Sequence, residues 1–236
     1  MLNTTKPATP EPALAMPKRY AVIVAGGSGT RMKSAVPKQF LLLNGLPVLM
    51  HTLQAFSKCN PQPNLILVLS EDYHSYWMHL CADHQFQLPY QLVSGGDSRY
   101  QSVKNALNLI EDDALVAVHD AVRPLIDIDI IERSYQQAEL QGAVVVAVRS
   151  RDSVRQVKDD RTQSLLREEI YLVQTPQTFK AALLKKAYEH PYRDGFTDDA
   201  SVVEQAGHPI DIVEGSYQNF KITFPEDIAI AELLLK

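Results

Sequence analysis

The chain has 236 residues, 45% of them hydrophobic, which is long enough for one well-buried core. Its 23 basic and 28 acidic residues give a formal net charge of −5, spread along the chain, which argues against a nucleic-acid-binding or membrane-binding surface. Two cysteines, Cys59 and Cys81, are too few for a secreted disulfide framework, so we expect a reducing, cytoplasmic location.

The first segment, residues 1–17, is rich in proline and contains no apolar run long enough for a signal sequence or a membrane span. We expect it to be a flexible leader. The remainder, 18–236, is expected to form a single soluble domain, because no other segment approaches transmembrane length and no internal repeat is visible.

Short apolar runs then alternate with amphipathic segments along the chain. The apolar runs predict strands buried on both faces, at 21–25, 65–69, 115–118 and 143–148. The amphipathic segments predict helices at 47–57, 72–82, 98–111 and 128–141. In the last of these, Asp129 and Glu132 fit a helix cap with an acidic first turn. The succession predicts a doubly wound, mostly parallel α/β sheet that binds ligands at the carboxyl ends of its strands.

The first predicted strand leads into a glycine-rich loop, residues 25–40, with the sequence AGGSGTRMKSAVPKQF. Its small residues allow backbone N–H groups to close on phosphate oxygens, so the loop predicts an anion site. It is not a Walker loop, because Thr30 and Arg31 stand where that motif has Lys followed by Ser or Thr. It is not the dinucleotide fingerprint either, because Met32 replaces the last glycine and Pro37 interrupts the helix that would follow.

Two basic residues of this loop, Arg31 and Lys38, can bring positive charge to the same phosphate chain. A forked guanidinium and an ammonium around one phosphorus atom suit a transition state that gathers negative charge on its oxygens. The glycine loop alone leaves open the alternative of a basic surface loop with solvated charges.

Two further segments follow predicted strands. In VAVHDAVRP, Asp120 ends a buried run, where its carboxylate can hold Mg²⁺ against nucleotide phosphates, or can cap a turn and pair with Arg123. In GGDSRYQSV, the glycines after a short strand lead into a helix that Asp97 or Ser98 can cap without any ligand.

The polar region of about 149–171 interrupts the α/β rhythm. Apolar pairs on either side of KDDRT predict a β-hairpin that projects from the main sheet. Such a projecting arm in a small enzyme often packs against a second subunit. The alternative is a mobile surface loop.

In their order along the chain, these segments resemble the cytidylyltransferases that join CTP to 2-C-methyl-D-erythritol 4-phosphate in isoprenoid precursor synthesis. The resemblance runs from about Tyr20 to the C-terminus and rests on AGGSGTRM, PKQF, GGDSRYQSV, HDAVRP, RDSVRQV, QTPQTF, TDDAS and NFKITFPED. It implies a nucleotidyltransferase sheet with a protruding arm that helps to form a homodimer. It also implies a Mg²⁺-dependent reaction that releases pyrophosphate and yields 4-diphosphocytidyl-2-C-methyl-D-erythritol.

The resemblance also implies roles for individual residues. Arg31 and Lys38 would be the catalytic cations, and Asp120 would hold the metal. The residues implied for CTP are Ala25, Gly26, Gly27, Gly96, Asp97, Ser102, Ala121 and Arg123. Those implied for the second substrate, some of them reaching across the dimer, are Ser153, Arg167, Thr175, Thr197 and Lys221. The chain departs from the family pattern at Gly26, where many members have Ala, and at Arg149 and Ser150, where Pro-Val is common.

Local structure offers a second explanation for three of the acceptor residues. Thr197 or Asp198 fits the N-cap of a helix that Gly207 ends. Thr175, before a proline, fits a turn, and Lys221 fits a solvated residue beside a strand.

Two other functions also remain open from the sequence. One is a cytidylyltransferase for a related polyol phosphate such as ribitol 5-phosphate, which shares the loop and the cations. The other is a catalytically silent nucleotide-binding or scaffolding protein, against which the presence of Arg31, Lys38 and Asp120 together argues.

Overall fold

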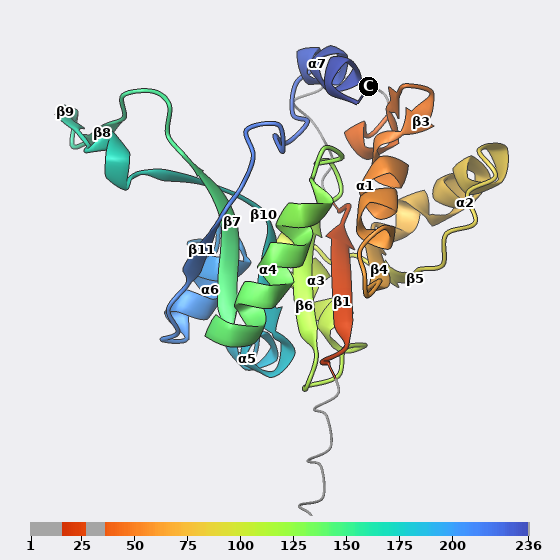
Figure 1. Ribbon diagram of the computed structural model, residues 1–236, viewed down its shortest axis with the longest axis horizontal. Helices are drawn as coiled ribbons and strands as arrows, with labels where there is room; N and C mark the ends of the chain where they lie inside the picture. Colours follow the sequence, from red (N-terminus) through yellow and green to blue (C-terminus); the bar gives the residue numbers. More distant parts are fainter. Residues whose placement is uncertain (1–15, 27–35, 236) are drawn as a thin grey trace, which may run out of the picture.

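The computed structural model describes residues 16–26 and 36–235, and its core is a seven-stranded sheet with helices on both faces (Figure 1). The strand order is β11-β7-β10-β6-β1-β4-β5, with β10 antiparallel to its neighbours β6 and β7 and the other pairs parallel. The strands are β1 (Arg19–Val24), β4 (Asn64–Leu69), β5 (Gln91–Ser94), β6 (Leu115–Asp120), β7 (Ala143–Arg149), β10 (Tyr171–Lys180) and β11 (Asp211–Glu214). The prediction of a doubly wound, mostly parallel sheet is confirmed.

The two faces of the sheet bury alternate residues of its strands. Ala21 and Ile23 of β1 face one hydrophobic cluster, whereas Tyr20 and Val22 face the other. The first cluster is covered by α1 (Val48–Ser57), α2 (His74–Asp83) and α4 (Ile128–Gln141). The second is covered by α3 (Arg99–Leu107), α5 (Ala181–Ala187) and α6 (Asp199–Gln205).

A smaller third cluster lies at the carboxyl end of the parallel strands. There α7 (Glu226–Leu234) packs through Ala231 near Val122 and Ile222, at the top of Figure 1. The short strands β2 (Leu42–Leu43) and β3 (Leu46–Pro47) form a small hairpin beside it.

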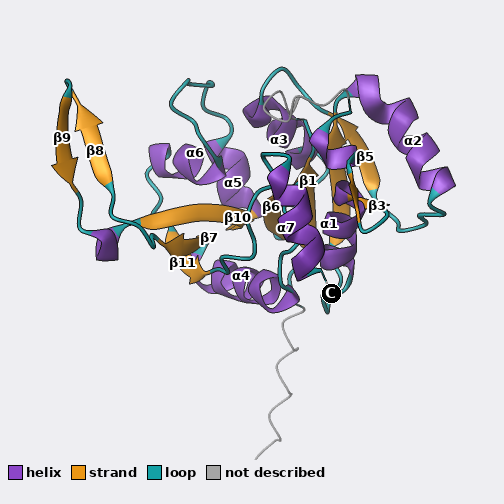
Figure 2. Ribbon diagram, turned by 90° about the horizontal axis from the view of Figure 1, so that it is seen from above, coloured by secondary structure: helices purple, strands orange, loops and turns teal. Residues whose placement is uncertain are grey.

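The predicted arm is present as a hairpin of β8 (Arg155–Lys158) and β9 (Arg161–Ser164), which projects from the ends of β7 and β10 (Figure 2). Its turn residues Asp159 and Asp160 have φ of 50° and 58°, the left-handed pair that a tight two-residue hairpin needs. All residues of both strands are exposed, so the arm has no core of its own.

Several details differ from the sequence predictions. The N-cap of α4 is Asp127, whose side chain accepts a hydrogen bond from the backbone N–H of Asp129, so Asp129 lies in the first turn and is not the cap. The structure also adds β10 and β11 to the predicted strands.

Most of the predicted leader lies outside the described residues, and the single-domain assignment stays a prediction. No helix in the described ranges is long and apolar enough to cross a membrane.

Candidate active site

A pocket of about 220 Å³ opens where β6 ends beside β10. It is lined by five residues that the resemblance to the cytidylyltransferases had singled out, namely Asp120, Arg123, Thr175, Thr197 and Lys221. Five residues to which the resemblance assigned no role complete the lining: Arg99, Val173, Gln174, Gln177 and Asp198. The pocket therefore gathers segments that lie up to about 120 residues apart in the sequence, from α3 to the segment after β11.

Asp120 is surrounded by three cations. Its Oδ2 lies 3.1 Å from Arg123 Nε and 3.2 Å from Lys221 Nζ, and its Oδ1 lies 4.0 Å from Arg99 Nε. Burial alone would raise the pKa of this carboxyl, but Lys221, Arg123 and Arg99 outweigh it and hold the pKa well below its usual range. Asp120 is therefore ionised at any physiological pH.

Thr175 connects the end of β6 to β10. Its Oγ1 accepts a 3.0 Å hydrogen bond from the Asp120 backbone N–H and lies 3.0 Å from Nδ1 of His119. Because Nε2 of His119 faces the carbonyl oxygen of Arg123 at 3.2 Å, Nε2 must carry the proton, and Thr175 must donate its own to Nδ1. Burial lowers the pKa of His119 to about 3, so the ring is neutral. The Thr175 hydroxyl can accept one more hydrogen bond but has no proton left to donate.

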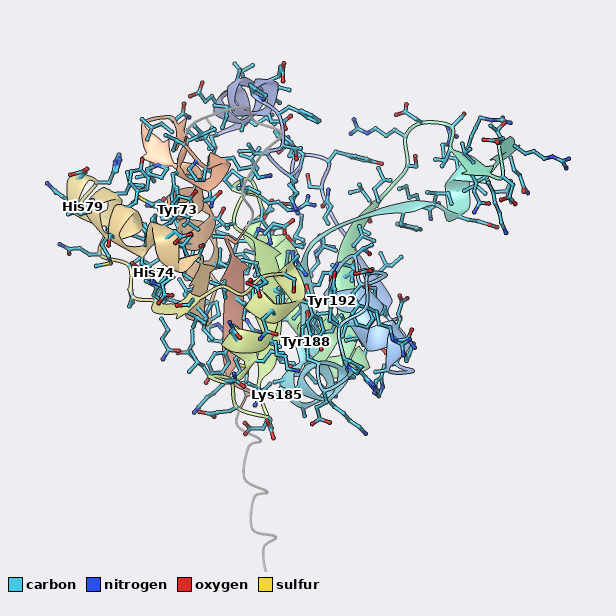
Figure 3. All side chains as sticks on the ribbon, turned by 180° about the vertical axis from the view of Figure 1, so that it is seen from behind. Tyr73, His74, His79, Lys185, Tyr188 and Tyr192 are labelled. Atoms are coloured by element: carbon cyan, nitrogen blue, oxygen red, sulfur yellow. The ribbon has the colours of Figure 1, made fainter. Side chains whose placement is uncertain are left out.

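Arg99, the first residue of α3, is held by a buried carboxylate. Its Nη2 lies 2.6 Å from Oδ2 of Asp199, while the Tyr188 hydroxyl donates to Oδ1 of Asp199 at 2.6 Å. Burial opposes the charge on Arg99, but Asp199 outweighs it and raises the pKa of the guanidinium. Tyr188 and Tyr192, both labelled in Figure 3, each contact the ring of Tyr100 of α3.

Two of the glycines expected to bind CTP, Gly26 and Gly96, lie near the Ser102 hydroxyl. The N–H of Gly96 donates to Ser102 Oγ at 3.1 Å, and a Cβ on Gly26 would lie 3.4 Å from the same oxygen. A Cβ on Gly96 would come within 2.3 Å of Gln101 Cγ, so this backbone position requires glycine. Asp97, next in the chain, is exposed. The structure thus brings Gly26, Gly96 and Ser102 together at one rim.

Lys38 and Ala121 are both buried, and their hydrogen bonds reach segments next to the pocket and next to this rim, respectively. Lys38 is 8% exposed, and its Nζ donates to the carbonyl of Ile222 at 2.9 Å, next in the chain to Lys221. Ala121 is buried and donates its backbone N–H to Val24, the last residue of β1. Ala25 follows Val24 and is held by Gln39, whose amide donates to the Ala25 carbonyl at 3.0 Å. Arg31 and Gly27 lie outside the described residues.

Ser153 and Arg167 are not part of this pocket. Both are exposed residues of the arm, and Arg167 contacts Arg151 and Glu168 there. Figure 2 shows the arm extending away from the sheet beyond the start of β10, whereas the pocket lies beside the end of β6 and the middle of β10. Within one chain, the acceptor residues therefore form two separate groups.

The segment after β11 is fixed to the pocket by residues that carried no prediction. The side-chain Nδ2 of Asn219 donates to Gln174 Oε1 at 3.1 Å and to the Thr175 carbonyl at 2.8 Å. The backbone carbonyl of Asn219 accepts a hydrogen bond from Arg123 at 2.8 Å. Gln174 and Gln177 belong to QTPQTF, Arg99 to GGDSR and Asn219 to NFKITFPED, so the motifs themselves were the available signal.

Comparison with known proteins identifies the family of this chain. The family model described as 2-C-methyl-D-erythritol 4-phosphate cytidylyltransferase matches residues 20–236. A curated relative of that name from Porphyromonas gingivalis is 46% identical over 220 residues, covering 92% of this chain and 98% of the relative. One from Bacteroides thetaiotaomicron is 45% identical over 218 residues, covering 92% of this chain and all of the relative (100%).

Solved structures give the same result. The crystal structure of 4-diphosphocytidyl-2C-methyl-D-erythritol synthase from Anaerococcus prevotii has a TM-score of 0.80 at 28% identity, covering 93% of this chain and 96% of that one. The Francisella tularensis 2-C-methyl-D-erythritol 4-phosphate cytidylyltransferase has a TM-score of 0.75 at 32% identity, covering 92% and 99%. The chain therefore belongs to the 2-C-methyl-D-erythritol 4-phosphate cytidylyltransferase family.

Proposed function

We propose that this chain transfers the cytidylyl group of CTP to 2-C-methyl-D-erythritol 4-phosphate, with release of pyrophosphate. The observation that carries the proposal is the pocket beside β6, where Arg123 and Lys221 lie within 3.2 Å of the Asp120 carboxylate. Cations held in place around a pocket of this size suit an acceptor that carries a phosphate group.

The glycine rim formed by Gly26, Gly96 and Ser102 is the proposed place of CTP, together with Asp97 and Ala121, whereas Arg123, which the resemblance also implied for CTP, lines the acceptor pocket. Ser102 is 1% exposed, and its hydroxyl donates to the Ser98 carbonyl at 2.9 Å, so the rim is rigid before any ligand binds. Lys38 donates to the carbonyl of Ile222, next in the chain to Lys221 of the acceptor pocket. We propose Lys38, together with Arg31 of the same loop, as the cations that stabilise the reacting phosphate.

The chemistry requires no general base. A phosphate monoester has a second pKa near 6, so the acceptor phosphate is largely a dianion at neutral pH and is already nucleophilic. One of its oxygens forms a bond to the α-phosphorus of CTP. The bond from that phosphorus to the oxygen bridging to the β-phosphorus breaks, and its electron pair leaves with pyrophosphate. Lys38, Arg31 and the loop amides offset the charge that gathers on the α-phosphate oxygens.

One carboxylate oxygen of Asp120 can serve as a Mg²⁺ ligand. Oδ2 is engaged by Arg123 and Lys221, but Oδ1 is 4.0 Å from Arg99, beyond hydrogen-bond distance, and is available as a ligand. In the described ranges, no group of three or more His, Cys, Asp and Glu side chains could hold a metal ion. Mg²⁺ is commonly held by one or two carboxylates together with substrate phosphates, so Asp120 would share the ion with CTP. When bound, the ion would neutralise charge on the triphosphate.

We also propose a specific part for Thr175. Since its proton is given to His119, it can contact the acceptor only by accepting a hydrogen bond, which suits a hydroxyl of the polyol better than its phosphate. Thr197, exposed at the opposite wall, can donate to either group.

We further propose a cytoplasmic homodimer formed through the arm. Support comes from the exposed apolar residues of the arm and its base, such as Val157, Leu166 and Leu172, which are 70%, 66% and 51% exposed. Ser153 and Arg167 would then meet an acceptor pocket on the partner subunit.

A pyrophosphate-release assay tests the proposed function. The enzyme is incubated with CTP, Mg²⁺ and one acceptor, either 2-C-methyl-D-erythritol 4-phosphate or ribitol 5-phosphate. We expect pyrophosphate with the first acceptor and little with the second. Release with ribitol 5-phosphate alone, or with neither acceptor, would contradict the proposal.

A further inference from the structure

The two glutamines of the QTPQ segment on β10 lie on either side of an irregularity in the sheet. Val173 pairs with Ala147 of β7 and Gln177 pairs with Val145. Residues 174–176 therefore lie opposite a single β7 residue, Val146. Such bulges redirect side chains and are common next to functional sites. Here the bulge directs Gln174, Thr175 and Gln177 into the lining of the acceptor pocket.

Gln177 holds the wall that carries Thr197. Its Oε1 accepts hydrogen bonds from the backbone N–H groups of Asp199 and Ala200, both at 3.0 Å, and its Nε2 donates to Oδ2 of Asp198 at 2.8 Å. Gln177 is 1% exposed. One buried amide thus fixes three consecutive residues immediately after Thr197.

Gln174 makes the corresponding contacts with the opposite wall. Its Nε2 donates to the Ser216 carbonyl at 2.9 Å, and its Oε1 accepts from the Asn219 amide at 3.1 Å. A Cβ on Gly215 would lie 2.7 Å from Gln174 Oε1, so the glycine at that position makes room for this contact. Lys221 follows two residues after Asn219.

We propose that Gln177 and Gln174 are positioning residues for the acceptor: Gln177 sets the position of Thr197, and Gln174 sets the position of Lys221. Thr175, between them, binds the end of β6 at Asp120. One short segment of β10 therefore connects to all three walls of the pocket. The inference rests on the proposed function, because it names the residues that shape the acceptor side of that reaction.

Only a side-chain amide satisfies the contacts of Gln177. Two backbone N–H groups require an acceptor, and the Oδ2 atom of Asp198 accepts a hydrogen bond and so requires a donor. Leucine in this position would leave all three groups without their partner, and glutamate would place a second carboxylate against Asp198. Both changes release the wall that carries Thr197, whereas the glycine rim proposed for CTP keeps its own contacts with Ser102.

The test measures steady-state kinetics with 2-C-methyl-D-erythritol 4-phosphate and CTP varied separately. For Gln177→Leu we expect the KM for the acceptor to rise about 10-fold, which corresponds to the loss of about one or two hydrogen bonds, while the KM for CTP stays within about 2-fold. We expect the same pattern for Gln174→Leu. An unchanged acceptor KM, or an equal rise in the KM for CTP, would overturn the proposal.

A reciprocal exchange separates positioning from general damage. Gln177→Glu alone should raise the acceptor KM because two carboxylates then face each other. Adding Asp198→Asn restores the pair, since the new amide at 198 donates to the carboxylate at 177 while its oxygen still caps α6. The double variant should reverse at least half of the rise in the acceptor KM, measured on a logarithmic scale. A double variant with the same acceptor KM as Gln177→Glu would overturn the proposal. This pair carries the test if Gln177→Leu does not fold.

Thr178→Val is the matched control. Thr178 is adjacent in β10 and fully buried, but its hydroxyl donates to Ser134 on the α4 side of the sheet, at 3.0 Å. We expect this variant to lose stability without a change in either KM. Failure of the wild-type protein to use the acceptor would refute the proposed function itself, whereas an active wild type with unaffected Gln177 and Gln174 variants would refute only this inference.

Discussion

Replacing Thr175 with valine should reduce stability strongly, even though the two side chains have nearly the same shape. The hydroxyl is the partner of two buried groups, the Asp120 N–H and Nδ1 of His119, both at 3.0 Å. Valine leaves both groups without a partner. The methyl group fills the space of the hydroxyl, so no cavity contributes to the effect.

The magnitude follows from these two groups. A buried donor or acceptor left unsatisfied costs about 1–3 kcal/mol, so the two together reduce the free energy of unfolding by about 2–6 kcal/mol. His119 is 0% exposed and Asp120 is 7% exposed, which leaves water little access to replace the hydroxyl. The loss would be a large part of the total stability of about 5–15 kcal/mol that is typical of a domain.

Urea unfolding followed by circular dichroism measures this loss. The unfolding midpoint of Thr175→Val should fall with little change in the slope, whereas Thr175→Ser keeps the hydroxyl and should stay within about 1 kcal/mol of the wild type. A decrease in the free energy of unfolding below about 1 kcal/mol for Thr175→Val would show that the hydroxyl does not make these two hydrogen bonds. The conclusion that Thr175 can only accept a hydrogen bond from the second substrate would then also be wrong.

Three more predictions concern other parts of the molecule. Gly96→Ala should raise the KM for CTP by about 10-fold or more in steady-state assays, because the new methyl lies 2.3 Å from Gln101 Cγ and must displace the rim; an unchanged KM would place CTP elsewhere. Lys38→Ala should reduce turnover by roughly 100-fold, on the scale of losing a preorganised charge partner, and near-normal turnover would contradict its catalytic role. Burial, with Glu132 adding to it, raises the pKa of Cys59 to about 12. Alkylation of the Cys59 thiol at about pH 8.5 should therefore be on the order of 1,000-fold slower in the native than in the urea-unfolded protein. Equal alkylation rates would refute the raised pKa of Cys59.

Much of the architecture was accessible from hydrophobic patterning. The buried runs of β1, β4, β6 and β7 are almost continuously apolar, and the intervening helices show clear amphipathic spacing. By contrast, β10 contains QTPQ, four residues whose polar side chains and proline do not read as a strand. The middle residues of β10 form a bulge, and their side chains form hydrogen bonds to other segments of the chain. Tertiary contacts rather than local sequence therefore determine the structure of β10.

The site could be predicted in part. Asp120 and Arg123 were expected to form either a ligand site or a local pair, and the structure shows the pair, with Nε of Arg123 3.1 Å from the carboxylate, facing the pocket. Thr197 precedes the N-cap Asp198, so its neighbourhood was correctly assigned to a helix start. Lys221 was expected next to a strand in the sequence, but it lies in the segment without regular secondary structure between β11, which ends at Glu214, and α7.

The residues that sequence reasoning missed share a physical reason. Gln174, Gln177, Asn219 and Arg99 act by hydrogen bonds to segments about 20 to 100 residues away, at positions that hydrophobic patterning does not mark. Hydrophobic periodicity reports which face of an element is buried, but it carries no information about the partner of a buried polar group.

The claim that the pocket around Asp120 binds the acceptor phosphate is tested most directly by Lys221→Ala. Lys221 is the most exposed of the three cations there, with 39% of its side chain accessible, so its removal disturbs the fold least. Lys185→Ala is a matched control, because this lysine, at the opposite end of the sheet in Figure 3, is also ion-paired and partly exposed.

The measurement is the KM of each substrate in the pyrophosphate-release assay. We predict that Lys221→Ala raises the KM for 2-C-methyl-D-erythritol 4-phosphate by about 10-fold or more and leaves the KM for CTP within about 2-fold, while Lys185→Ala changes neither. A rise confined to the KM for CTP, or an unchanged acceptor KM, would contradict the assignment of the pocket.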